Sequence, residues 1–396
     1  MANPPLTVEI WQKILRHAIF VPVFLDSDPV ETYGTEALPY FHDEGPYWEA
    51  ERGRNSLRRV FWAWNLYLRA YDNRYIRLSD VARLCVPAIA LSRAIRISVA
   101  NCYTSHFPTL SAIEDSVESK PEPWQMEILD GRCVASMDVI QFLTMPHRIS
   151  NIRAEINGVP ILYEALAKNQ SPVTFLGNTR YTTLPWQSFN LRHTTTMMIA
   201  ISGDWEHPFL DMPKLRHLQI CTFLGDRNYQ KVFRWLKVIG GQLRTLYWKG
   251  RECPVPLDPN IWEMCPAVEV LEMPCDWRYQ PPPPANHPIR ALRVDMRRIY
   301  HTAEEFCHIR GHFHPSLRPG VPLNVLEKAN IRTLANTEHW LEEREGGSNR
   351  TLIDAIFCLR NQADKQGIAL VDLKWRTYEE FSRLRFGLKP QTPYII

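Results

Sequence analysis

The sequence predicts an α/β protein in which an all-α module precedes an irregular solenoid with a curved, mostly parallel sheet. Apolar residues recur at helical spacing near the start of the chain, and again between residues 57 and 68. Farther along, a short apolar pattern returns every ~20–30 residues, which is typical of repeats that each contribute one strand. We expect the helical module to span residues 1–80, the solenoid 81–386 and a tail 387–396.

The composition is that of an ordinary globular protein. The 396 residues are 45% hydrophobic and 22% charged, which is enough for a large core or two domains. Apolar runs are shorter than the ~20 residues of a membrane helix, and the basic-then-apolar pattern of a secretory signal is missing. Nine cysteines without a C-x-x-C pair indicate reduced thiols. We therefore expect a protein of the cytoplasm or the nucleus that makes no membrane contact.

Residues 6–19 are predicted to form one amphipathic helix that begins after two prolines and is capped by Thr7. One apolar stripe consists of Val8, Trp11, Leu15 and Ala18, and a second consists of Leu6, Ile10 and Ile14. An arc this wide predicts contact on two sides. One side is the protein's own core, and the other is a second chain. The alternative is that both stripes are buried against residues 81–396.

The next segments alternate between loop and helix. Residues 20–46 contain four prolines and two glycines and predict a long loop with a short strand at its start. Residues 47–70 predict one or two helices. Their apolar stripe repeats at three and four residues and consists of Leu57, Val60, Phe61, Trp64 and Leu68.

These residues resemble a known family. The first helix, with Glu9-Ile10-Trp11 and Ile14-Leu15, is similar to the opening helix of an F-box. The later Leu57-Arg58 and Trp64-Asn65 are similar to its second characteristic segment. The lead-in "YWEAER" and the "YIRL" of residues 75–78 resemble the F-box-like proteins of mushroom-forming (basidiomycete) fungi. Thr7 stands where proline usually follows the first leucine, and Phe61 where cysteine is common.

The resemblance implies a partner, because F-box helices dock on the Skp-type adaptor of cullin–RING ubiquitin ligases. The second apolar stripe of the first helix would then be covered by another chain, in the helix-in-groove manner. The adaptor contacts that this reading implies are Leu6, Ile10, Trp11, Ile14, Leu15, Leu57, Val60 and Trp64.

A rival interpretation uses the same stretch. Residues 52–77 hold seven arginines and one acidic residue, Asp72, interleaved with aromatic residues that could stack on bases. The aromatics also fall on the apolar stripe, where packing in a core is their usual role, and the net charge of the chain is only +3. The sequence therefore favours core packing over nucleic acid.

Four segments share the pattern apolar-x-x-apolar-x-apolar. Their central residues are Leu218, Leu246, Leu271 and Leu292, with steps of 28, 25 and 21 residues. This spacing matches degenerate leucine-rich repeats, whose neighbours share one continuous core. Further strands are expected within residues 94–100, 149–156, 172–178, 195–203 and 368–375. The alternative is an unrelated α/β domain in which the pattern recurs by chance.

Three other stretches carry weaker signals. Residues 279–286 include four consecutive prolines and predict a stiff loop rather than a ligand for proline-reading domains. Residues 297–326 predict another long loop. This loop contains one group of potential metal ligands, Cys307, His308, His312 and His314, but Gly311 breaks the helix that ligands four residues apart would need.

No P-loop, dinucleotide-binding, nucleophile-elbow or zinc-protease motif occurs in the sequence. We therefore expect a non-enzymatic protein without cofactor or metal. Its first 80 residues would bind the adaptor and cullin assembly, and its repeats a protein substrate that the sequence does not name. The alternative is a repeat scaffold that binds proteins without any part in ubiquitin transfer.

Overall fold

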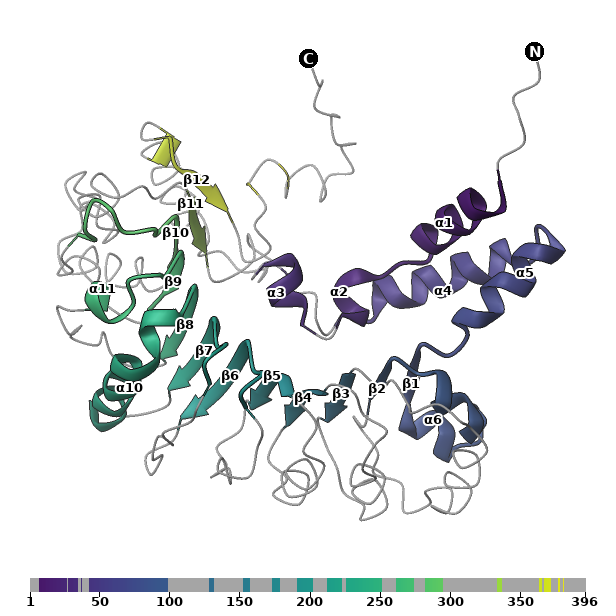
Figure 1. Ribbon diagram of the computed structural model, residues 1–396, viewed down its shortest axis with the longest axis horizontal. Helices are drawn as coiled ribbons and strands as arrows, with labels where there is room; N and C mark the ends of the chain where they lie inside the picture. Colours follow the sequence, from purple (N-terminus) through teal and green to yellow (C-terminus); the bar gives the residue numbers. More distant parts are fainter. Residues whose placement is uncertain are drawn as a thin grey trace, which may run out of the picture. The chain divides into compact units, whose positions relative to one another are not determined.

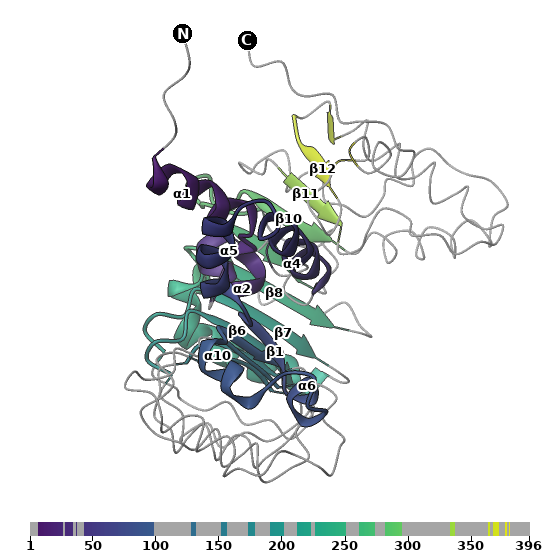
Figure 2. The same cartoon turned by 90° about the vertical axis from the view of Figure 1, so that its right-hand side faces the viewer.

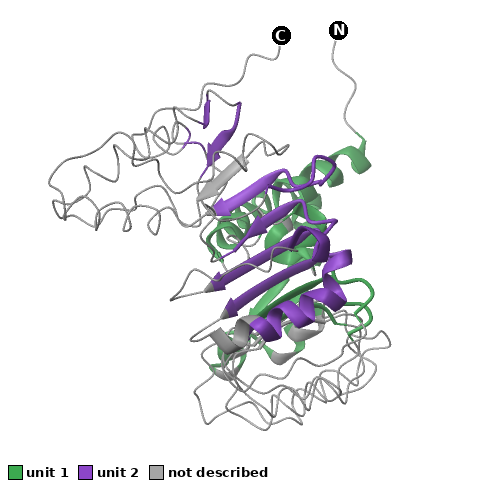
Figure 3. Ribbon diagram, turned by 90° about the vertical axis from the view of Figure 1, so that its left-hand side faces the viewer, with its two compact units in different colours: residues 1–199, 208–215 green, residues 200–207, 216–396 purple. Residues whose placement is uncertain are grey.

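The protein is described here from a computed structural model. The described residues are 7–26, 28–34, 37, 43–98, 128–131, 152–156, 173–178, 191–201, 212–222, 226–250, 261–273, 282–294, 333–336, 363–364, 367–371, 377 and 380. The chain divides into two compact units, residues 1–199 with 208–215, and residues 200–207 with 216–396 (Figure 3). Both units contain helices and parallel strands, which confirms the α/β class.

Unit 1 begins with the predicted helix, α1 (Val8–Ala18). Thr7 is its N-cap residue and has extended backbone angles, but its side chain caps no helical N–H. Two helices follow farther on, α4 (Gly45–Leu57) and α5 (Trp62–Leu68), which continues into the 3-10 turn η2 (Arg69–Tyr71). The apolar stripe predicted over residues 57–68 is therefore interrupted, because Val60 and Phe61 lie in the turn between α4 and α5.

The segment predicted as a loop between residues 20 and 46 differs from that expectation. It contains two short helices instead of a strand, α2 (Pro22–Leu25) and α3 (Pro29–Tyr33). Each helix has a proline in its first turn, where the missing N–H costs nothing and the fixed φ favours helix. The Asp28 carboxylate accepts a hydrogen bond from the Glu31 N–H and caps α3.

Six parallel strands of unit 1 pair in chain order (Figure 1). They are β1 (Tyr75–Arg77), β2 (Arg96–Ser98), β3 (Ile128–Gly131), β4 (Ile152–Ile156), β5 (Val173–Asn178) and β6 (Thr196–Ile201). Helix α6 (Leu78–Ala82) and the 3-10 helix η3 (Ala88–Arg93) connect β1 to β2. The first strand thus lies inside the 80 residues that were predicted to be all helical.

Unit 2 repeats this arrangement with six further parallel strands. They are β7 (His217–Thr222), β8 (Thr245–Gly250), β9 (Val270–Glu272), β10 (Ala291–Val294), β11 (Thr333–Asn336) and β12 (Ala369–Val371). Helix α10 (Asp226–Ile239) with η5 (Gly240–Gln242) precedes β8 (Figures 1 and 2), and α11 (Ile261–Met264) precedes β9 (Figure 1). Each of the four segments with the repeated apolar pattern contains one strand.

One row of leucines runs across the strands of unit 2. Leu218, Leu246, Leu271 and Leu292 are direct register partners from β7 to β10, and the row continues through Leu334 and Leu370. The first four are at most 1% exposed. Since register partners point to the same face of a sheet, the repeated leucine of the sequence pattern builds a single core layer.

Among the described residues, none of the helices combines the length and the apolar character that crossing a membrane requires.

Candidate protein-docking surface on the N-terminal helices

Helices α1, α4 and α5 pack around a small apolar core. Leu15 and Ile19, at the C-terminal end of α1, are buried together with Leu68 of α5. Partly buried side chains surround this core, namely Leu57, Trp64, Tyr67 and Tyr71. The rings of Trp11 and Trp64 lie 5.1 Å apart, so α1 and α5 also meet at one exposed edge of the core.

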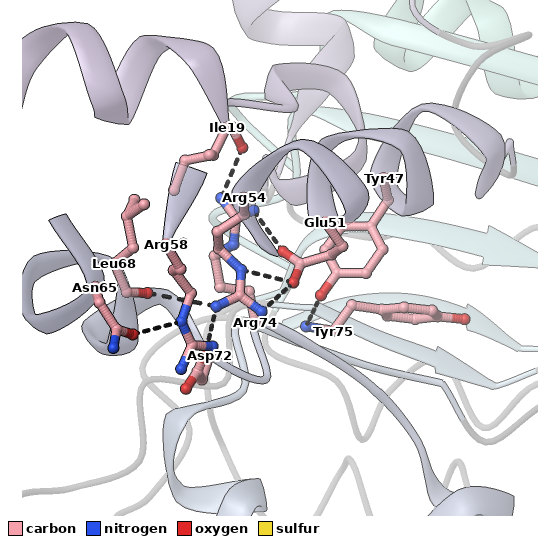
Figure 4. Close-up of polar contacts among 10 residues, drawn as sticks. All are labelled: Ile19, Tyr47, Glu51, Arg54, Arg58, Asn65, Leu68, Asp72, Arg74 and Tyr75. Carbon is pink, nitrogen blue, oxygen red and sulfur yellow. Dashed lines mark hydrogen bonds and ion pairs between the residues drawn. The ribbon is translucent and has the colours of Figure 1, made fainter. Parts of the chain in front are cut away.

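A buried network of ion pairs fixes the other side of these helices (Figure 4). Glu51 of α4 binds two guanidinium groups, with Arg54 Nη2 at 2.6 Å and Arg74 Nη2 at 2.8 Å. Asp72 pairs with Arg54 and, at 3.1 Å, with Arg58. Arg74 also donates to the carbonyl oxygen of Ile19 at 2.9 Å. The network therefore joins the end of α1, the middle of α4 and the residues just before β1.

The electrostatics of the network favour the charged state of Arg54. Burial alone would lower the pKa of its guanidinium, but Glu51 and Asp72 together raise it. The side chains of Glu51 and Arg54 are only 11% and 7% exposed, so water screens this pair weakly. The ion pair therefore belongs to the interior of unit 1 and not to its surface.

A second polar group lies where α4 meets β1. Glu44 accepts hydrogen bonds from Tyr75 Oη at 2.8 Å and from Trp48 Nε1 at 3.1 Å, and it pairs with Arg77. Burial opposes ionisation of Glu44, but the hydrogen bonds from Arg77, Tyr75 and Trp48 outweigh burial and lower the pKa of its carboxyl. This group attaches the start of α4 to the sheet.

The outer side of the same helices is apolar and exposed. On α1, Ile10 and Ile14 are each 44% exposed, and Trp11 is 36% exposed. We define the exposed helical surface as these three residues together with Val8, Val60, Phe61, Trp62 and Leu66, all of which are more than half exposed. Large apolar side chains that are exposed on neighbouring elements, here α1, α5 and the turn before α5, are typical of sites that bind another protein.

The eight residues implied by the F-box resemblance have different positions. Ile10, Trp11, Ile14 and Val60 belong to the exposed helical surface. Leu15 is 3% exposed and lies in the core of the three helices, which Leu57 and Trp64 border. Leu6 lies outside the described residues. Sequence reasoning did not select Val8, Trp62 or Leu66 as contacts. Val8 is exposed because only the C-terminal end of α1 reaches the core, and Trp62 begins α5 directly after the break that separates it from α4.

The arginines of residues 52–77 do not form one exposed basic stripe. Arg54, Arg58, Arg74 and Arg77 all pair with carboxylates, and Arg54 and Arg74 are buried. Arg52 lies 3.9 Å from Glu49, with both side chains exposed. Five of the seven guanidinium groups therefore already pair with acidic side chains of the same unit, which argues against a phosphate-binding surface here.

The proposed metal ligands Cys307, His308, His312 and His314 lie outside the described residues. Within the described part of the chain, no three His, Cys, Asp or Glu side chains are placed to hold a metal ion. Burial raises the pKa of the Cys265 thiol to about 12, so this cysteine is neutral and unreactive at physiological pH.

No family model and no curated protein matches this sequence.

Proposed function

We propose that this chain is a non-catalytic substrate receptor of a Skp–cullin–F-box type ubiquitin ligase. In this proposal, the exposed helical surface binds the adaptor and the strands with their connections bind a protein substrate. The observation that carries the proposal is the exposure of Ile10 and Ile14 on a helix whose Leu15 and Ile19 are buried. An isoleucine side chain that stays in water adds no hydrophobic stabilisation to the helix. The groove of a partner protein would bury both side chains and so stabilise the complex.

The arrangement of the strands supports the repeat part of the proposal. Within each unit, every strand pairs in parallel with the next strand along the chain, as stacked repeats require. A receptor of this kind needs no chemistry of its own. It raises the local concentration of a substrate lysine near the ubiquitin carrier by holding both on one support.

The test is co-purification of the full chain with a Skp-type adaptor. The double variant Ile10→Asp/Ile14→Asp should lose the complex, because two charges would enter an apolar interface. Its circular dichroism and its unfolding midpoint should stay close to those of the wild type, since both side chains are exposed in the free chain. Val238→Asp is the matched control and should retain the adaptor. Val238 is an apolar residue of α10 whose side chain is 61% exposed.

Two results would overturn the proposal. One is a wild-type chain that stays free of adaptor at micromolar concentrations of both proteins. This result would favour the second candidate, a repeat scaffold that binds proteins without a role in ubiquitin transfer. The other is unfolding of the double variant, because Ile10 and Ile14 would then be needed for the fold.

A further inference from the structure

Residues 21–26 and 28–33 contact one face of the unit 1 sheet and are called the strap here. The strap contains α2 and α3 and joins α1 to the segment that leads into α4. Helices of four and five residues are too short to be stable by themselves in water. The conformation of the strap therefore depends on what it touches.

At its first end the strap inserts an aromatic side chain. Phe24 is 1% exposed, and its ring centroid lies 4.9 Å from that of Tyr75 and 5.3 Å from that of Tyr47. The guanidinium of Arg96, on β2, lies 4.0 Å from the centroid of the same ring. Arg96 Nη1 also donates a hydrogen bond of 3.1 Å to the carbonyl oxygen of Phe24.

Four residues after Phe24, the strap presents a carboxylate to two hydroxyl groups. Asp28 is 8% exposed, and its Oδ1 accepts a hydrogen bond of 3.0 Å from Thr196 Oγ1. Its Oδ2 accepts a second hydrogen bond from Thr195 Oγ1. Thr196 is the first residue of β6 and Thr195 directly precedes it, so the strap contacts β2 and the start of β6, which are separated by more than 90 residues of sequence.

The receiving residues lie on one face of the sheet. Tyr75 and Arg96 are register partners, Arg96 pairs onward with Ile128, and Phe175 pairs with Thr196. The neighbouring row, which includes Ile76, Ile97 and Met197, points to the opposite face and is buried. The face therefore offers the strap three specific contacts. Aromatic rings surround the Phe24 side chain, a guanidinium binds a main-chain carbonyl, and two hydroxyl groups bind a carboxylate.

We propose that this face of the unit 1 sheet is a peptide-binding surface and that the strap occupies it as an internal pseudo-ligand. The partner is a protein segment with the same chemistry, an aromatic side chain followed four positions later by a carboxylate. This inference rests on the proposed receptor function, because the peptide that replaces the strap would be part of the substrate. An attached strap competes at the millimolar effective concentration typical of short connections, so a partner peptide binds only when the strap leaves.

The experiment uses the full chain and a fluorescent peptide with the sequence of residues 20–34. Asp28→Ala removes the carboxylate from the strap and leaves the sheet face intact. Thr195→Val/Thr196→Val removes the hydroxyls from the face and leaves the strap intact. Both variants should increase hydrogen exchange of the strap amides. Only Asp28→Ala should bind the peptide, about tenfold or more tightly than the wild type does.

Two results with Asp28→Ala would overturn the inference. One is a strap that exchanges freely while the peptide still does not bind. The other is strap exchange equal to that of the wild type, because Asp28 would then not hold the strap on the sheet. Binding of equal strength to Asp28→Ala and to the threonine variant would also contradict it, since the hydroxyl pair would then have no part in recognition.

If Asp28→Ala does not fold, the wild type provides the test. An isotopically heavy version of the peptide, at millimolar concentration, should accelerate exchange of the chain's own strap amides, and unchanged exchange would contradict the inference. The adaptor is absent from every arm of these measurements. Failure of peptide binding therefore contradicts only the peptide-binding surface and not the adaptor proposal. Loss of adaptor binding contradicts only the adaptor proposal.

Discussion

Glu51 and Arg74 form a buried ion pair, with Arg74 Nη2 2.8 Å from Glu51 Oε1, and they come from a helix and from the residue before a strand. The same carboxylate binds Arg54, while Arg74 also donates a hydrogen bond to the carbonyl oxygen of Ile19, the residue that follows α1. One carboxylate thus connects the helices that carry the exposed helical surface to the sheet.

Replacement of Glu51 should be strongly destabilising. Glu51→Gln removes the carboxylate that pairs with the buried Arg74 and one of the two carboxylates that pair with the buried Arg54. We expect a loss of about 3–5 kcal/mol in the free energy of unfolding. Urea denaturation followed by circular dichroism measures this loss. Glu49→Gln is the matched control on the same helix. Its 3.9 Å pair with Arg52 is exposed and should change stability by less than ~0.5 kcal/mol. Equal effects of the two changes would contradict a buried network.

A side chain at Gly240 should destabilise the fold for steric reasons. A Cβ at this position would overlap the carbonyl oxygen of Met264 and lie 2.9 Å from Cys265 Sγ. Gly240→Ala should therefore cost about 1–3 kcal/mol through overpacking against α11. The neighbouring Gly241 has no atom within 4 Å of such a Cβ, so Gly241→Ala should be close to neutral. Thermal unfolding of the two variants gives the comparison, and a stable Gly240→Ala would refute the close packing.

The leucine row predicts that shortening a buried side chain costs far more stability than shortening an exposed one. Leu246 is fully buried between Leu218 and Leu271, and Leu246→Ala should cost about 2–5 kcal/mol. Val238, on the exposed side of α10, should tolerate alanine within ~0.5 kcal/mol. Chemical denaturation of both variants measures the difference. A loss below 1 kcal/mol for Leu246→Ala would contradict a continuous core layer.

Alkaline pH should destabilise the region around Tyr75. Burial, reinforced by Glu44, raises the pKa of the Tyr75 hydroxyl to about 12, against about 10 for an unperturbed tyrosine. The folded state therefore holds this proton to higher pH. Its stabilising contribution is complete below pH ~10 and is lost as the pH rises toward ~12. The slope is at most ~1.4 kcal/mol per pH unit for one proton.

Tyr75→Phe should flatten the loss of stability between pH 10 and 12, as measured by urea titrations at several pH values. Tyr71→Phe is the matched comparison. At Tyr71, burial acts to raise the pKa of the hydroxyl, but hydrogen bonds with Tyr67 and Arg16 lower it. Removing this hydroxyl should not flatten the alkaline loss. Identical pH profiles for the wild type and Tyr75→Phe would show that Tyr75 does not contribute.

The strands of unit 2 were largely predictable from the sequence. Leucine at the centre of apolar-x-x-apolar-x-apolar identifies β7 to β10, because a buried strand needs apolar residues at alternate positions. Strand β11 escaped this pattern. Its Leu334 is in register with Leu292, but Asn336 replaces the last apolar residue and the step between the two leucines is far longer. Strand β1 was assigned to the helical module, since three residues give no periodicity.

The surface of α1 was harder to predict. Val8 shares a stripe with Leu15, yet Val8 is 67% exposed and Leu15 is buried. The reason is that only the C-terminal half of α1 reaches the core, through Leu15 and Ile19. The pairing of Arg54 and Arg74 with Glu51 was equally hidden, because it depends on residues that meet only after α4 and β1 are in place.

The chain-order pairing of the strands affects how this protein can change over evolution. Each strand pairs with the strand that precedes it in the sequence. Duplication of one strand with its connection would therefore extend a sheet without changing how the other strands are connected. The stretch between Leu292 and Leu334 is already much longer than that between Leu271 and Leu292, while the register stays unbroken. Insertions can therefore accumulate in the connections without changing the pairing of the strands.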